Sequence, residues 1–161
     1  MFIIYLAAFL LQPFLYNLIP VLGDNINLLL CLTVMFTFLY DDEEQGIFFG
    51  FIFGLLHDLF FGLYAGPGVL SLVLCGILVM IIKAHINVEN FFNGILITLF
   101  STWIYASLYW GVYHFLGSPY SYVYVMKWLP LSLLFNCIFA AGLYFILIKR
   151  VIKHRRDRYF R

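Results

Sequence analysis

Charged residues are scarce in this sequence. They make up 11% of its 161 residues, whereas 65% are hydrophobic, 21% are aromatic and the mean hydropathy is +1.00. Small soluble domains leave a large fraction of their residues in water, so a domain of this size could not hide that much apolar surface. The composition therefore excludes a soluble globular domain and indicates a chain whose solvent is a lipid bilayer.

Cysteine is scarce too, and its spacing is uninformative. Cys31, Cys75 and Cys137 lie in apolar segments, with no CxxC or other paired spacing. This excludes a disulfide framework and a cysteine zinc site. The four histidines are scattered and form no HExxH motif, so we expect no metal and no cofactor.

Common catalytic signatures are missing as well. The sequence has no GxSxG nucleophile motif and no GxxxxGK phosphate loop. We therefore expect neither an enzyme nor a nucleic-acid-binding protein.

Apolar runs separated by polar residues, glycine or proline indicate an all-α membrane protein with about six transmembrane helices. The first run lacks the basic region and cleavage site of a signal peptide, so we expect it to remain as a helix. The second and fourth runs, about 15 and 14 residues, are short against the roughly 20 needed to cross a bilayer. We predict one polytopic domain over residues 1–148, a basic tail over 149–161, and helices at residues 2–22, 26–40, 47–63, 69–82, 91–116 and 128–148.

Basic residues indicate the orientation. With a cytoplasmic N-terminus, Lys83 and the basic tail lie inside and Lys127 lies outside, as the positive-inside rule requires. We therefore predict that both termini are cytoplasmic.

Aromatic residues gather at the predicted outer edge of the last two helices. One interpretation is an interfacial belt, because amphipathic rings prefer the headgroup level. The alternative is a short extended segment at residues 120–124, where tyrosines alternate and could face an extracytoplasmic partner. The residues concerned are Tyr109, Trp110, Tyr113, Tyr120, Tyr122, Tyr124 and Trp128.

Four glycines follow one ridge of the third predicted helix at a spacing of four, and Asp58 stands in the same series. They are Gly46, Gly50, Gly54 and Gly62, which we call the glycine ladder. A ridge of glycines lets another helix approach closely in lipid. The spacing predicts a packing face, and it leaves open whether the chain itself or a partner's helix fills it.

Asp58 is the unusual residue of that helix. Counted from Gly46 at about 1.5 Å per residue, it lies roughly 18 Å deep, just past the middle of the bilayer core. A charged aspartate there costs about 2.5–3.5 kcal/mol, so we expect a hydrogen-bonded polar layer. Because burial disfavours the charged form, we expect Asp58 to be protonated part of the time. The same count gives a similar depth for Gln12, Ser101, Thr102 and Asn136.

The stretch GFIFGLLHDLFFGLYAGPG resembles the MreD family of bacterial rod shape-determining membrane proteins. The family's run Gly-Phe-x-x-Gly-Leu-x-x-Asp, followed by a glycine-rich turn, is matched in register here. The first span also contains an early Leu-Gln pair, and the chain ends in a basic tail. The matching residues are Gly50, Phe51, Gly54, Leu55 and Asp58, then Gly62 and the turn Gly66, Pro67 and Gly68.

This resemblance implies a non-enzymatic scaffold of the cell-elongation machinery in the bacterial cytoplasmic membrane. It implies a six-helix bundle similar to the substrate-binding subunits of energy-coupling-factor transporters. The implied partners are a bitopic MreC-like protein, an MreB-like cytoskeletal protein and peptidoglycan synthases, besides membrane lipids. The alternative is a small-solute-binding subunit of a transporter, in which Asp58, Gln12 and Asn136 line a substrate cavity.

Overall fold

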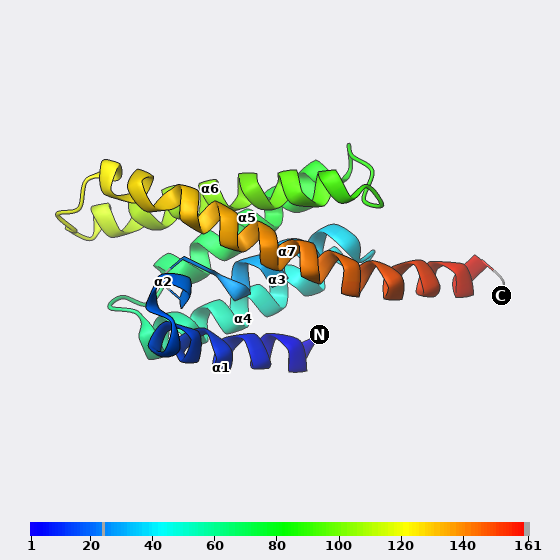
Figure 1. Cartoon of the computed structure of the whole chain (residues 1–161), viewed down its shortest axis with the longest axis horizontal. Helices are drawn as coiled ribbons and strands as arrows, with labels where there is room; N and C mark the ends of the chain where they lie inside the picture. Colours follow the sequence, from blue (N-terminus) through cyan, green and yellow to red (C-terminus); the bar gives the residue numbers. More distant parts are fainter. Residues whose placement is uncertain (24, 160–161) are drawn as a thin grey trace.

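The computed structural model describes the backbone of residues 1–23 and 25–159, and the side chains up to residue 148 apart from residue 24. Over these residues the chain forms helices and no strand, so the prediction of an all-helical protein is confirmed. The helices, labelled in Figure 1, are α1 (Phe2–Leu18), α2 (Pro20–Gly23), α3 (Leu28–Leu39), α4 (Glu43–Phe61), α5 (Pro67–Lys83), α6 (Phe91–Phe115) and α7 (Tyr122–Tyr159).

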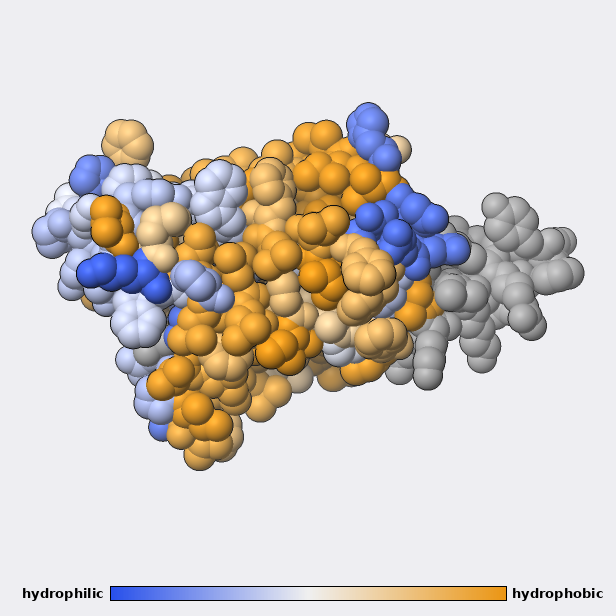
Figure 2. Space-filling view, turned by 45° about the horizontal axis from the view of Figure 1, so that its top comes forward, coloured by the Kyte–Doolittle hydropathy of each residue, from blue (hydrophilic) through white to orange (hydrophobic). Residues whose placement is uncertain are grey.

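Among the described residues, three segments are long and apolar enough to cross a membrane: α4, α6 and residues 122–148 of α7. The apolar helices α1, α3 and α5 are shorter, with 17, 12 and 17 residues. Figure 2 shows an apolar belt between two more hydrophilic ends. The chain thus has the helices of a membrane protein, and the count of six spans stays a prediction.

Several predicted boundaries are wrong. The first run breaks at Ile19, because a residue that precedes proline is disfavoured in helical geometry. The alternating tyrosines do not form an extended segment: α7 begins at Tyr122, and the rings of Tyr120 and Tyr124 stack with centroids 5.4 Å apart. The predicted tail at 149–161 continues α7 as far as Tyr159, and its last two residues lie outside the described residues.

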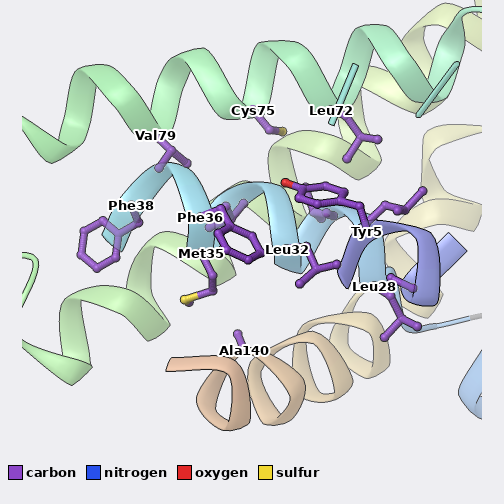
Figure 3. Close-up of a cluster of buried hydrophobic side chains, with 14 of the residues drawn as sticks. Tyr5, Leu28, Leu32, Met35, Phe36, Phe38, Leu72, Cys75, Val79 and Ala140 are labelled. Atoms are coloured by element: carbon purple, nitrogen blue, oxygen red, sulfur yellow. The ribbon is translucent and has the colours of Figure 1, made fainter. Parts of the chain in front are cut away.

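Helix α3 is the core of the bundle. All twelve of its residues are buried, and it contacts α1, α4, α5, α6 and α7. Figure 3 shows Tyr5 from α1, Leu72, Cys75 and Val79 from α5, and Ala140 from α7 around it. A helix that is apolar on every side is stable only when it is covered on every side. Here the neighbouring helices supply that cover.

The glycine ladder packs inside the bundle. A Cβ atom on Gly46 would lie 2.5 Å from Thr37 Oγ1, and one on Gly50 would lie 2.6 Å from Thr33 Oγ1. One on Gly54 would lie 2.8 Å from a methyl carbon of Leu72 on α5, and one on Gly62 would meet the α4 backbone at Asp58. Gly46, Gly50 and Gly54 therefore pack α4 against α3 and α5, and helices of the same chain fill the groove at these three positions.

Two polar contacts hold neighbouring helices on α3. The buried Tyr5 hydroxyl shares its single proton between the Gly46 carbonyl at 3.1 Å and Thr33 Oγ1 at 3.3 Å, which ties α1 to α3 and α4. At the C-terminal end of α3, Lys83 Nζ donates to the carbonyls of Thr37 and Tyr40 and pairs with Glu43 Oε1 at 3.1 Å. A cation stabilises the exposed carbonyls of a helix end.

We expect Gly50→Ala to destabilise the protein by about 1–3 kcal/mol, because the added methyl group overlaps Thr33. Thermal unfolding of the purified chain in detergent measures the loss. Gly111→Ala on α6 is the control, since no heavy atom lies within 4 Å of its added Cβ and alanine favours a helix.

Adding Thr33→Ala removes the two nearest atoms and leaves the Thr33 Cβ at 3.4 Å. The double variant should therefore lose less stability than the sum of the two single variants. Additive losses, or equal effects of Gly50→Ala and Gly111→Ala, would contradict this packing.

Candidate functional site

Asp58 caps the first turn of α5 from the end of α4. Its Oδ2 atom accepts hydrogen bonds from the backbone N–H groups of Gly66 at 3.0 Å, Gly68 at 2.9 Å and Val69 at 3.0 Å. The first N–H groups of a helix have no partner within the helix, and a carboxylate beside them also complements the helix dipole. Asp58 is only 4% exposed, so these bonds are made away from bulk solvent.

The turn before α5 is built to receive this carboxylate. Gly66 has a φ angle of 130°, which favours glycine, and Pro67 occupies the start of the helix, where its missing N–H costs nothing. A Cβ atom on Gly68 would collide with the Asp58 carboxylate. The structure therefore brings Asp58 and the predicted turn residues together, for a reason that the sequence pattern alone did not give.

Helix α4 spans Glu43–Phe61, so Asp58 lies in its last turn, and its depth in the bilayer stays a prediction. All three hydrogen bonds end on the Oδ2 atom of the carboxyl group. The partial protonation of Asp58 stays a prediction.

Gln12 and Asn136 do for α3 what Asp58 does for α5. Gln12 Oε1 accepts from the Leu28 N–H at 2.9 Å, while its Nε2 donates to the Ile26 carbonyl at 2.6 Å. Asn136 Oδ1 accepts from the Asn27 N–H at 2.8 Å. Side chains from α1 and α7 thus satisfy the backbone where α3 begins inside the bundle.

Of the remaining residues of the predicted polar layer, Thr102 bonds to Asn136 and Ser101 does not. Thr102 Oγ1 accepts a hydrogen bond from Asn136 Nδ2 at 3.3 Å. Ser101 is buried, and its backbone carbonyl accepts a hydrogen bond from Cys75 Sγ on α5 at 3.5 Å. Asp58 shares no hydrogen bond with Gln12, Thr102 or Asn136 among the described contacts. The layer is therefore two separate caps.

The two caps border one cavity of about 680 Å³, which we call the aromatic cavity. Its lining comes from residues 25–29, the α4–α5 turn and the α6–α7 connection, among others. The α4–α5 turn and the α6–α7 connection lie at the left of Figure 1. The volume of the cavity falls within the range of small-molecule sites. The residues that line it include the polar Gln12, Asp58, Thr102 and Asn136 and the rings of Tyr64, Tyr105, Tyr109, Trp110, Tyr113, Tyr120 and Tyr124.

A row of tyrosines on α6 forms one wall of the aromatic cavity, and sequence reasoning missed its role. The ring centroids of Tyr105 and Tyr109 are 5.8 Å apart, and those of Tyr109 and Tyr113 are 4.8 Å apart. Their spacing of four in YASLYWGVY was the available signal, since such residues share one helix face. Several rings predicted for an interfacial belt line this cavity, and the belt itself stays a prediction.

The described residues form no candidate metal site. No group of three or more of their His, Cys, Asp and Glu side chains could hold an ion.

Comparisons with protein-family models, with characterised proteins and with solved structures gave no match. The fold and the site nevertheless define a class of protein. It is an all-helical chain with helices able to cross a membrane, in which two buried helix starts border a cavity with aromatic walls.

We expect Asp58→Leu to destabilise the protein by roughly 3 kcal/mol or more, because it leaves three buried N–H groups unpaired at about 1–3 kcal/mol each. Asp58→Asn should cost less, since its amide oxygen still accepts. Thermal unfolding in detergent compares the two variants.

Asp42→Asn and Asp42→Leu are the matched controls, because Asp42 is exposed and, although it precedes the first turn of α4, its side chain makes no capping hydrogen bond. Both should lower the unfolding temperature much less than Asp58→Leu does. Equal losses from Asp58→Asn and Asp58→Leu would show that the charge of Asp58, and not its hydrogen bonding, stabilises the fold.

Proposed function

We propose that the chain is a non-enzymatic membrane scaffold of the bacterial cell-elongation machinery, of the MreD type. The observation that carries the proposal is the role of the motif it shares with that family. Gly50 and Gly54 seat α4 on α3 and α5, and four residues after Gly54 the carboxylate of Asp58 caps α5. The spacing of the motif thus places α4 against α3 and α5 and brings the Asp58 carboxylate to the start of α5.

The remaining motif residues favour a contact on the outer side of α4. Phe51 is 47% exposed and Leu55 is half-buried, and they share a row with the exposed Phe48 and Leu59. Because the glycine ladder is filled by the chain's own helices, a bitopic MreC-like helix would dock on this outer row. The N-terminus and the basic end of the chain would lie in the cytoplasm, where an MreB-like protein could reach them.

A second function, binding of a small solute for a transporter, is favoured by the aromatic cavity. Gln12, Asp58 and Asn136 line it, as that alternative requires. Both amide groups, however, already hydrogen-bond to the protein, so fewer polar atoms remain for a solute. A bundle similar to the substrate-binding subunits of energy-coupling-factor transporters fits both functions.

Depletion of the protein in its native bacterium separates the two functions. A scaffold of the elongation machinery predicts rounded cells with undirected wall growth, which microscopy and labelling of new peptidoglycan detect. Cells that keep their rod shape but need a supplied nutrient would contradict the scaffold and favour the transporter subunit.

Docking on the outer row of α4 predicts that Phe51→Ala weakens co-purification of the MreC-like protein several-fold. Phe92→Ala on α6 is the control, because Phe92 is also strongly exposed and lies on another helix. Unfolding temperatures of both variants confirm that each is folded. If the two variants co-purify equal amounts of the MreC-like protein, the outer row of α4 is not the docking face.

A further inference from the structure

The aromatic cavity contains a buried acceptor that the fold does not use. Asp58 Oδ2 takes all three backbone N–H groups of the cap, and no donor among the described residues reaches Oδ1. Asp58 lines the cavity and is only 4% exposed. Oδ1 keeps accessible surface toward the cavity, so a donor group of a ligand can reach it.

The lining has the charge balance of a cation site. The described residues around the cavity include one carboxylate, Asp58, one histidine, His57, and no lysine or arginine. The helix starts nearby offer little to an anion, because Gln12, Asn27 and Asn136 already accept N–H groups at the start of α3. The N–H groups of α5 are likewise taken by Asp58.

The walls suit an organic cation and not a metal ion. Tyr105, Tyr109 and Tyr113 form a continuous row of rings. The ring centroid of Tyr64 lies 5.7 Å from that of Tyr113. The faces of aromatic rings attract ammonium groups, most strongly where water is excluded. A hard metal ion would need several oxygen ligands at once, and the described residues provide no such cluster.

We propose that the aromatic cavity binds a small organic cation, whose ammonium group lies against Asp58 and whose apolar part lies along the tyrosine row of α6. This inference goes beyond the scaffold role, since it assigns a ligand class to a site that docking on the outside of α4 does not use. At about 680 Å³ the cavity has room for a molecule with one or two rings.

The test uses the full chain in lipid nanodiscs and isothermal titration calorimetry. The probe is benzyltrimethylammonium, with the neutral 2-phenylethanol and the anionic phenylacetate as probes of similar size. We expect the cation to bind at least tenfold more tightly than the neutral probe and the anion not to bind. Binding of phenylacetate or 2-phenylethanol as tight as that of the cation, or no binding of the cation, overturns the proposal.

Three variants locate the site. Asp58→Asn should weaken cation binding at least tenfold while its amide oxygen keeps the α5 cap. Tyr109→Leu should weaken it about threefold to thirtyfold and leaves the carboxylate in place. Trp103→Leu is the control, because Trp103 lies on α6 outside the cavity lining and is 45% exposed.

Undiminished cation binding by Tyr109→Leu, or equal weakening by Trp103→Leu, overturns the proposed location even if Asp58→Asn fails to fold. Cell shape, observed by microscopy, tests the scaffold proposal separately. A Tyr109→Leu strain that keeps its rod shape while the protein loses cation binding shows that the ligand and the scaffold role are independent.

Discussion

The backbone N–H groups at the starts of α3 and α5 must find acceptors inside an apolar bundle. In lipid, an unpaired N–H group costs several kcal/mol, so a helix that begins within the membrane protein needs a cap from a neighbour. Asp58 supplies it for α5, and Gln12 and Asn136 supply it for α3. The positions of α1, α4 and α7 are thereby fixed relative to the two short helices.

The close packing of α3 follows from the same arrangement. A twelve-residue helix is about 18 Å long and cannot reach both faces of a bilayer, so it is stable only as a core covered by longer helices. Gly46 and Gly50 let α4 approach that core, and Tyr5 and Lys83 satisfy polar atoms along it. The first turns of α3 and α5 border the aromatic cavity.

The sequence predicted much of this from local rules. Apolar runs predicted helices in the right regions, and the spacing of four predicted that the glycines pack. The depth count grouped Asp58 with Gln12, Ser101, Thr102 and Asn136, and all of these except Ser101 line one cavity. Depth alone did not give their partners, because Asp58, Gln12 and Asn136 bond to the backbone at the starts of α3 and α5. The tyrosine row of α6 escaped notice because an interfacial belt explains the same residues.

Composition and periodicity by themselves determined that this chain is helical and apolar, and that one face of α4 accepts a close neighbour. Those properties depend on residues within a few turns of one another. Only the tertiary structure decided that the neighbour is α3 and α5 of the same chain, and that Asp58 caps a helix. Hydrogen bonds such as that between Asn136 and Asn27, 109 positions apart, depend on which helices meet, and no local pattern encodes that choice.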